Sequence, residues 1–247
     1  MYKLVIFDLD GTLAESKQPL TPMMAALLAR LLSTLRVAIA SGGALAQFQK
    51  QVVDLLPLEA HLENLYLLPT SGGALYEWHN DAWNKVYEER LSETEAKRIE
   101  EIIKEAAVET RVVHFDEPAF GERIEYRGAQ VTFSALGQKA PLEAKKAWDP
   151  DHSKRRALQA AIVARLPGFS ATIGGATSID VTKHNIDKAY GVRKLCERIG
   201  ISEIDAVYVG DELVAGGNDE VIYKTQVPTH AVTSPEDTAR YIVSLLS

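Results

Sequence analysis

Two carboxylates lie close together near the start of the chain, in the Asp-Leu-Asp-Gly-Thr sequence of residues 8–12. They follow an apolar run, residues 4–7, which has the pattern of a strand buried on both faces. Alternation would direct Asp8 and Asp10 to the same side if the strand continued, and Gly11 permits a sharp turn that brings them together. One such carboxylate can attack phosphorus while the other handles the proton of the leaving group. The motif therefore indicates nucleophilic and acid–base chemistry.

Further polar residues follow other predicted strands. Ser41-Gly42-Gly43 ends a second strand and Gly210-Asp211 ends a late one, with Asn218 and Asp219 shortly beyond. Lys188 lies at the start of a predicted helix. The carboxyl ends of parallel strands form the ligand-binding edge of an open α/β sheet, so we expect these groups to converge on one crevice. A nucleophile, a proton carrier, cations and a metal-binding set are what phosphoryl transfer needs.

Each feature has a simpler explanation when it is taken alone. Ser41 could be a helix N-cap, Lys188 a solvated helix residue, and Asn218-Asp219 part of a turn. A calcium-binding loop also begins with Asp-x-Asp, but it requires glycine at the sixth position and glutamate at the twelfth. Here glycine is fourth and Pro19 is twelfth. The order of the whole set along the chain, rather than any one member, therefore carries the prediction.

A parallel sheet must position these residues, because both ends of the chain alternate strand-like and helix-like patterns. Short apolar runs predict strands at residues 4–7, 37–40, 64–70 and 206–209. Two helices are predicted with both ends, one that follows Gly43 and runs to Leu56 and one from Asp187 to Gly200. Three more are predicted to begin after Thr21-Pro22, after Asp219 and after Ser234-Pro235.

The middle of the chain has a different pattern. Ser92 and Glu95 form a capping-box signature that opens a helix, and Asp149-Pro150 predicts the start of another. Strands are predicted at residues 123–127, 130–136, 169–173 and 178–181. Runs of antiparallel strands with two helices indicate an α+β domain inserted into an α/β one. We therefore expect an α/β core of residues 1–84 and 186–247, and an inserted α+β domain of residues 85–185.

Composition excludes several classes of protein. The 247 residues are 46% hydrophobic and 25% charged, which is ordinary globular usage. Lys plus Arg is 27 and Asp plus Glu is 34, and the formal net charge of −7 lacks the basic footprint of a nucleic-acid binder. The single cysteine, Cys196, excludes a disulfide framework. No signal peptide or apolar stretch of about 20 residues is recognisable. We expect a soluble, cytoplasmic protein with no nucleic-acid or membrane partner.

The order of the four motifs resembles the haloacid dehalogenase superfamily, and the inserted domain resembles its type IIB cap. More specifically, residues 210–219, Gly-Asp-Glu-Leu-Val-Ala-Gly-Gly-Asn-Asp, are similar to the fourth motif of the eukaryotic-type phosphomannomutases. Residues 232–238 resemble their C-terminal tail, and residues 124–127 and 173–180 resemble their sugar-phosphate-binding strands. The resemblance covers essentially the whole chain. It implies a Rossmannoid core with a parallel sheet, plus an α+β cap with an antiparallel sheet that sets substrate specificity.

The resemblance also implies a role for each matching residue. Asp8 would be the nucleophile that forms an aspartyl-phosphate, and Asp10 the general acid and base. The residues that would hold Mg²⁺ or support its site are Asp8, the main-chain carbonyl of Asp10, Asp211, Asn218 and Asp219. Those that would cradle the transferring phosphoryl group are Ser41, Gly42, Gly43 and Lys188. In the cap, the sugar phosphate would be bound by Arg127 at its distal phosphate and by Ser178 and Asp180 at its hydroxyls.

Several phosphate-binding positions depart from the family pattern. Further cap arginines of the family correspond to Gln138 and Lys145, and its core arginine after the first motif corresponds to Lys17. A guanidinium binds phosphate through two parallel hydrogen bonds, whereas lysine supplies a point charge and Gln138 supplies none. The lysine that follows the fourth-motif aspartate is Glu212 here. These departures weaken the grip on a second phosphate.

Three functions stay open. The first is phosphomannomutase-like interconversion of mannose 1-phosphate and mannose 6-phosphate, with hexose 1,6-bisphosphate as activator. The second is a sugar-phosphate phosphatase on the same scaffold, because hydrolysis needs only water for its second half-reaction. The third is a non-catalytic phosphosugar-binding protein, which would have no need of the nucleophile Asp8. The resemblance further implies a homodimer formed through the cap.

Overall fold

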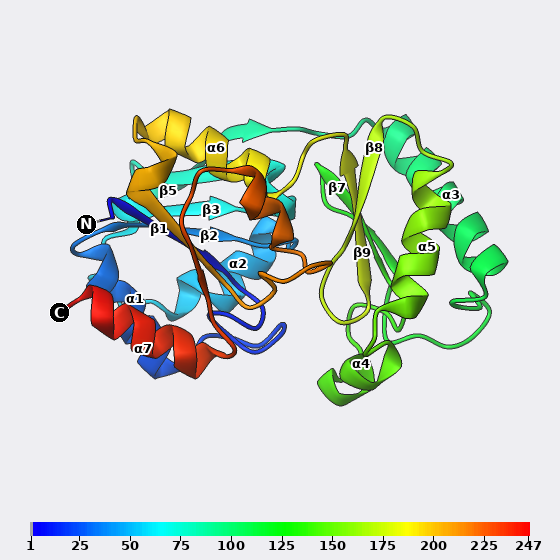
Figure 1. The fold of residues 1–247 in the computed structure, drawn as a ribbon, viewed down its shortest axis with the longest axis horizontal. Coiled ribbons are helices and arrows are strands. Elements are labelled where there is room, and N and C mark those ends of the chain that lie inside the picture. Colours follow the sequence, from blue (N-terminus) through cyan, green and yellow to red (C-terminus); the bar gives the residue numbers. More distant parts are fainter. Residues whose placement is uncertain (1) are drawn as a thin grey trace. The chain divides into compact units, whose positions relative to one another are not determined.

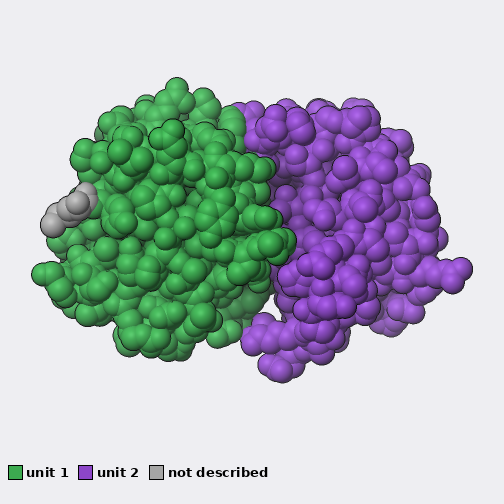
Figure 2. All heavy atoms as spheres, in the orientation of Figure 1, with its two compact units in different colours: residues 1–88, 187–247 green, residues 89–186 purple. Residues whose placement is uncertain are grey.

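The structure, a computed structural model, describes residues 2–247, which form two compact units (Figure 2). The first unit combines the chain up to residue 88 with residues 187–247, and the second is residues 89–186. The division expected between residues 84 and 85 falls inside β5 (Ala82–Glu88), a strand that the sequence analysis did not predict. No helix among residues 2–247 is both long and apolar enough to cross a membrane.

A seven-stranded sheet with the order β11-β10-β1-β2-β3-β4-β5 forms the centre of the first unit. Its strands are β1 (Leu4–Asp8), β2 (Arg36–Ala40), β3 (Leu65–Leu68), β4 (Ala74–His79), β5, β10 (Ala206–Gly210) and β11 (Thr229–Ala231). Its α-helices are α1 (Pro22–Leu32), α2 (Leu45–Gln51), α6 (Lys188–Ile199) and α7 (Pro235–Leu245). The five strands from β11 to β3 are parallel, and β4 and β5 are antiparallel. Because β1 lies between β2 and β10, the strand order reverses there, which is where such sheets bind ligands.

Strand β1 is buried on both faces, as its continuous apolar run predicts. Val5 and Phe7 belong to the hydrophobic cluster that contains residues of α1, α2 and α7. Leu4 and Ile6 belong to the cluster on the other face, which contains residues of α6. Figure 1 shows α6 on one side of this sheet and α1 and α7 on the other. The two packed faces fix the register of β1 and hence the position of the carboxylate at its end.

Helix caps in the first unit agree with the sequence signals. The Thr21 hydroxyl accepts a hydrogen bond from the Met24 N–H, and the Asp187 carboxylate accepts one from the Tyr190 N–H. Gly200 ends α6 with a left-handed φ of +70°. Two predicted helices are shorter than expected. The one up to Leu56 is α2 followed by a 3₁₀ turn (Val53–Leu55), and the one after Asp219 is a 3₁₀ segment (Glu220–Lys224).

The β4–β5 hairpin was missed in the sequence. Its turn residues, Asn80 and Asp81, have φ values of +52° and +56°, as a tight hairpin turn of this kind requires. Trp78 and Trp83 are register partners on either side of the turn, and their rings meet edge to face with centroids 5.4 Å apart. An Asn-Asp pair between two aromatic residues was therefore the signal that could have revealed these strands.

The second unit contains a four-stranded antiparallel sheet with the order β6-β7-β9-β8. Its strands are β6 (Ile124–Tyr126), β7 (Gln130–Ser134), β8 (Phe169–Ile173) and β9 (Ser178–Lys183). Its helices are α3 (Glu93–Thr110), α4 (Leu142–Trp148) and α5 (Ser153–Val163). Apolar residues of β7 and β9 pack with those of α3 and α5 in one hydrophobic cluster. This sheet and the parallel one confirm the predicted fold class.

Two helix starts in the second unit test the sequence signals. The capping box is present, because the Ser92 hydroxyl accepts from the Glu95 N–H and the Glu95 carboxylate accepts from the Ser92 N–H. The helix expected to open at Asp149-Pro150 begins instead at Ser153, after α4, which was not predicted. The Asp149 carboxylate nevertheless accepts hydrogen bonds from the main-chain N–H groups of Lys154 and Arg155, which belong to the first turn of α5.

Candidate active site

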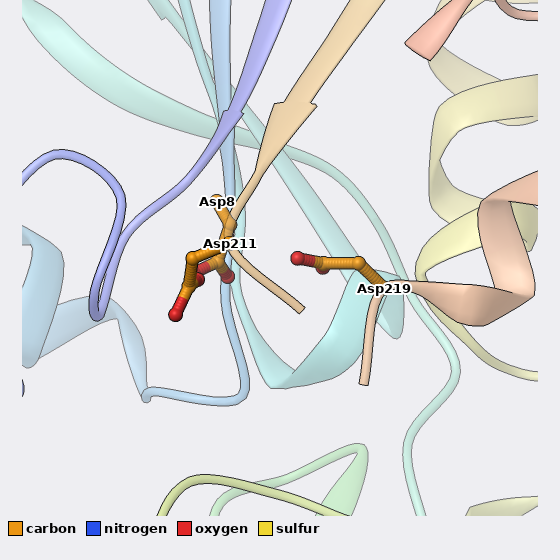
Figure 3. A group of neighbouring side chains, drawn as sticks. All are labelled: Asp8, Asp211 and Asp219. Atoms are coloured by element: carbon orange, nitrogen blue, oxygen red, sulfur yellow. The ribbon is translucent and has the colours of Figure 1, made fainter. Parts of the chain in front are cut away.

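Three carboxylates meet at the carboxyl edge of the parallel sheet (Figure 3). Asp8 is the last residue of β1, Asp211 follows β10, and Asp219 precedes the 3₁₀ segment of residues 220–224. One oxygen from each carboxylate lies within 4.8 Å of the other two. Asp8 and Asp219 are buried and Asp211 is partly exposed. These three residues, called the carboxylate cluster below, were all predicted from the sequence to share one crevice.

Lys188 binds the carboxylate cluster from the first position of α6. Its Nζ atom donates to Asp8 Oδ1 at 2.6 Å and to Asp219 Oδ1 at 2.7 Å. It also donates to Asn218 Oδ1 at 2.6 Å. Burial alone would lower the pKa of Lys188, but the negative charges of Asp219 and Asp8 outweigh burial and raise that pKa above its usual value. Lys188 is therefore a buried, permanently charged ammonium.

Two carboxyl groups of the cluster, those of Asp8 and Asp211, have raised pKa values. Burial raises the pKa of Asp8 well above its usual value, and the charges of Asp219 and Asp211 add to this effect although Lys188 opposes it. Burial likewise raises the pKa of Asp211 to about 6, although the hydrogen bond from Thr12 acts in the opposite direction. Raised pKa values at two neighbouring carboxyl groups mark an environment that favours an added positive charge.

The composition of the cluster fits Mg²⁺. Three ionised carboxylates and one ammonium would leave a net charge of −2, which matches one divalent cation. The ligand atoms are carboxylate oxygens, the type that Mg²⁺ prefers. A cation among them would offset the burial and the charge repulsion that raise the pKa of Asp8 and Asp211. Asp8, Asp211 and Asp219 are thus the residues that could hold the metal. The main-chain carbonyl of Asp10 stays a predicted ligand.

Gly11 and Thr12 hold the loop after β1 against the loop after β10. The Thr12 hydroxyl donates to Asp211 Oδ1 and accepts from the Asp211 N–H, both at 3.0 Å. Gly11 has a φ of +95°, and a Cβ atom there would lie 2.3 Å from Asp211 Oδ2. Only glycine satisfies both conditions, the left-handed φ and the close approach. The positive φ agrees with a sharp turn at Gly11, and the close contact of this turn is with Asp211.

Asp10 lies outside the carboxylate cluster. Its carboxylate accepts hydrogen bonds from the main-chain N–H of Lys17 and from Gln47 Nε2, the latter at 3.4 Å. Lys17 contributes its backbone here, at a left-handed φ of +57°. Strand β1 ends at Asp8, so the alternation expected to align Asp8 and Asp10 does not extend to Asp10. The two carboxylates therefore have separate partners, as residues with different chemical roles would.

The loop after β2 reaches the same edge of the sheet. Asp8 is the register partner of Ala40, so Ser41 follows directly beside the end of β1. Ser41 is buried, and its Oγ accepts from the Gly43 N–H at 3.2 Å. Gly42 is partly exposed. The phosphate-binding role of these three residues stays a prediction, and Ser41 is the one that the strand register places beside the end of β1.

In the second unit, the sheet face opposite the hydrophobic cluster is polar. Cross-strand register aligns Thr172, Asp180, Thr132 and Glu125 in one row across all four strands. Thr132 Oγ1 donates to Asp180 Oδ1 at 2.9 Å. Ser178 lies two residues before Asp180 on β9 and is partly exposed. The structure thus places the predicted pair Ser178 and Asp180 on one polar face.

The predicted phosphate-binding residues of the second unit also lie together. Arg127 Nη2 donates to Glu125 Oε2 at 2.6 Å and to Gln138 Oε1 at 3.3 Å. Lys145, which is buried, donates from Nζ to the main-chain carbonyl of Gln138 at 3.3 Å. Arg127, Gln138 and Lys145 therefore form one polar group, and the contact with Glu125 offsets the charge of the arginine.

Sequence reasoning gave no role to Thr12, described above, and it also missed Tyr208, which binds the carboxylate cluster. Tyr208 is fully buried on β10, and its hydroxyl donates to Asp219 Oδ1 at 2.6 Å. Burial and the nearby carboxylates raise the pKa of Tyr208 well above its usual value, so this hydroxyl stays a donor. The available signal was a polar-tipped residue inside an otherwise aliphatic strand, residues 206–210.

Comparisons with known proteins agree with this geometry. A sequence profile described as haloacid dehalogenase-like hydrolase matches residues 5–219. The phosphomannomutase of Saccharomyces cerevisiae is 27% identical over 251 residues, which cover 99% of this chain and 94% of the yeast protein. That of Glycine max is 27% identical over 254 residues, with 98% and 95% covered.

A solved structure shares the fold. The IMP-bound, N-terminally truncated IMP-nucleotidase of Plasmodium falciparum aligns with a TM-score of 0.70 at 17% identity, covering 99% of this chain and 68% of that one. Because the family profile spans most of the sequence, including the segments that contribute Asp8, Lys188 and Asp219, this protein is an enzyme that belongs to the haloacid dehalogenase-like hydrolase family.

Proposed function

We propose that this enzyme carries out Mg²⁺-dependent phosphoryl transfer on hexose phosphates and interconverts mannose 1-phosphate and mannose 6-phosphate. The observation that carries the proposal is the contact of Lys188 with Asp8 inside the carboxylate cluster. A carboxylate at the end of a buried strand, next to a buried ammonium, is suited to attack a phosphate ester. The near-full-length similarity to proteins named phosphomannomutase supports the choice of substrate.

Asp8 is the nucleophile in this scheme. One of its carboxylate oxygens attacks phosphorus, the bond from phosphorus to the sugar oxygen breaks, and Asp10 donates a proton to that oxygen. Lys188 offsets negative charge on the phosphoryl oxygens, with Ser41 and the neighbouring glycine amides as further donors. Mg²⁺, when bound, supplies electrostatic stabilisation of the same group. In the return step, Asp10 takes the proton of the accepting hydroxyl.

The second unit binds the rest of the substrate. Arg127 and Lys145 hold the phosphate that is not being transferred, with Gln138 as a neutral partner. Ser178 and Asp180 contact sugar hydroxyls, which need both donors and acceptors of hydrogen bonds. The scheme also includes hexose 1,6-bisphosphate as activator, a homodimer formed through the second unit, and a cytoplasmic location, each of which stays a prediction.

Phosphorus NMR tests this function directly. The protein is incubated with Mg²⁺, mannose 1-phosphate and a trace of hexose 1,6-bisphosphate, and the spectrum is followed over time. We expect the signal of the 6-phosphate to grow at the expense of the 1-phosphate. Release of inorganic phosphate without the 6-phosphate would overturn the mutase assignment, and no change with a panel of phosphorylated sugars would overturn the substrate class.

Hydrolysis of sugar phosphates is the second candidate, and the contact between Glu125 and Arg127 favours it. A mutase must hold its second phosphate and rebind a bisphosphate in the inverted orientation, which requires strong positive charge. Here the charge of Arg127 is offset by Glu125, and Gln138 adds none. Glu125→Gln separates the candidates, because removing this charge should strengthen binding of a bisphosphate more than that of a monophosphate. If Glu125→Gln changes the binding of bisphosphate and monophosphate equally, the contact between Glu125 and Arg127 gives no support to hydrolysis.

A further inference from the structure

A buried ion pair lies at the start of α5 in the second unit. Asp149 and Arg155 are each 2% exposed, and Arg155 Nε donates to Asp149 Oδ2 at 2.8 Å. Arg155 Nη2 donates to the main-chain carbonyl of Asp149 at 3.0 Å. Burying a guanidinium costs free energy unless its N–H groups donate hydrogen bonds. The acceptors of the remaining N–H groups therefore show what the residue holds in place.

The remaining nitrogen of Arg155 holds the turn between β8 and β9. Nη1 donates to the main-chain carbonyl of Gly175 at 2.5 Å and to that of Gly174 at 3.3 Å. Both carbonyls belong to the hairpin that leads directly into Ser178 and Asp180. The planar guanidinium therefore connects Asp149, at the start of α5, to the glycine turn through four hydrogen bonds, two to Asp149 and two to the turn carbonyls.

The turn itself is packed against the proposed sugar-binding residues. A Cβ atom at Gly174 would lie 3.1 Å from Asp180 Oδ2 and 3.3 Å from Ser178 Cβ. The Gly174 N–H donates to the main-chain carbonyl of Ser178 at 2.9 Å. A shift of the Gly174 backbone would therefore move the side chains that are proposed to contact the sugar.

We propose that Arg155 is a positioning residue for substrate recognition, which fixes the Gly174–Gly175 turn so that Ser178 and Asp180 meet the sugar hydroxyls. The proposal rests on the proposed function of the site. Arg155 does not touch the substrate; its role is to hold two carbonyls that a flexible glycine turn would otherwise leave mobile. A change at Arg155 should therefore weaken recognition of the sugar and leave the phosphoryl transfer at Asp8 unchanged.

Arg155→Lys separates positioning from stability. A lysine ammonium can keep the ion pair with Asp149, but it lacks the planar group that reaches the turn carbonyls at the same time. The matched control is Arg165→Lys, a change of the same kind in the same unit at an exposed ion pair with Glu109. Steady-state rates are measured with mannose 1-phosphate and with para-nitrophenyl phosphate, whose aryl group offers no sugar hydroxyls.

For Arg155→Lys we expect the KM for mannose 1-phosphate to rise about tenfold, with kcat and the aryl phosphate rates within about twofold of the parent enzyme. Arg165→Lys should change neither. An unchanged KM, or an equal loss with both substrates, would overturn the positioning role.

Hydrogen exchange of the turn amides gives an answer that does not need turnover. Arg155→Lys should speed exchange in residues 174–178 while α3 and β7 stay protected. If the parent enzyme turns over no hexose phosphate, the proposed function fails, yet this measurement still decides whether Arg155 holds the turn. Unchanged exchange in residues 174–178 would show that it does not.

Discussion

Lys188 Nζ lies 2.6 Å from Asp8 Oδ1, although the two residues are 180 positions apart in the sequence. Asp8 ends the first strand of the chain, and Lys188 begins the helix that follows the second unit. Both side chains are about 5% exposed, so the pair is shielded from water. A buried charge that loses its partner is costly, so each residue depends on the other. The insertion of residues 89–186 therefore separates the two halves of one site in sequence without separating them in space.

Asp8→Asn should abolish turnover while leaving the protein folded. An amide cannot attack phosphorus, and we expect kcat to fall at least about a thousandfold. Lys188 keeps its contacts with Asp219 and Asn218, so the ammonium stays satisfied. Steady-state phosphate transfer and thermal unfolding are the measurements. Asp81→Asn, the same change in an exposed hairpin turn, serves as the control and should retain full activity. Substantial residual turnover in Asp8→Asn would rule out Asp8 as the nucleophile.

Much of the first unit could be predicted because its signals are local. The run of residues 4–7 is apolar throughout, which marks a strand buried on both faces. Thr21 and Asp187 precede helices and cap them, and each cap needs only a residue three positions away. The residues of the carboxylate cluster could be predicted because parallel strands end at one edge of the sheet. The predicted fold class is confirmed by the two sheets, and the predicted family is confirmed by the sequence profile.

The partners of the site residues depend on contacts between distant segments and were not predictable in this way. Tyr208 looks like a core residue of β10, and only the folded chain directs its hydroxyl to Asp219. Asp8 and Asp10 look equivalent in the sequence, but the turn at Gly11 gives them different donors. Helix α4 was missed because its seven residues mix charged and apolar types and no side chain caps its N-terminus.

The increase in thermal stability that Mg²⁺ causes should depend on pH. Because the pKa of Asp211 is about 6 and that of Asp8 is also raised, the metal-free protein binds protons at these groups more tightly than the unfolded chain does. The contribution of Asp211 to the free energy of unfolding is present below the ordinary aspartate pKa of about 3.9 and is lost as pH rises through about 6. The contribution of Asp8 is lost in the same direction, as pH rises through its own raised pKa. Mg²⁺ requires the ionised carboxylates and should restore that stability.

Thermal unfolding with and without Mg²⁺ checks this. We expect a larger rise in Tm at about pH 7.5 than at about pH 5, and no rise at either pH in Asp211→Asn. An equal rise at both pH values would contradict binding at the carboxylate cluster.

Gly11→Ala should damage the site more than the fold. The new Cβ would be 2.3 Å from Asp211 Oδ2, and the residue would have to keep a φ of +95°. Gly200→Ala is the matched control, because Gly200 has a φ of +70° in the same unit but nothing lies within 4 Å of its Cβ position. Both variants should lose about 1–2 kcal/mol of stability from the left-handed backbone. Only Gly11→Ala should also lose activity and the stabilisation by Mg²⁺, measured by initial rates and by the metal-dependent change in Tm.

Tyr208→Phe should weaken the site through Asp219. The change removes one hydroxyl and leaves the ring, so packing in the core is kept. Asp219 Oδ1 then retains Lys188 as a donor but loses the hydrogen bond of 2.6 Å from Tyr208. A carboxylate with fewer donors is oriented less firmly, and we expect kcat to fall roughly tenfold and the Mg²⁺ concentration for half-maximal activity to rise.

Tyr66→Phe is the control for that prediction. Tyr66 is also a buried tyrosine of the parallel sheet, but its charged neighbours are Arg36, Glu77 and Arg198 rather than the carboxylate cluster. Removing its hydroxyl should leave both kcat and the Mg²⁺ dependence within about twofold of the parent enzyme. If the two variants lose activity equally, the effect reports general stability of the sheet. If Tyr208→Phe keeps full activity and the Mg²⁺ affinity of the parent enzyme, the prediction is wrong, and Lys188 orients Asp219 without help from the tyrosine.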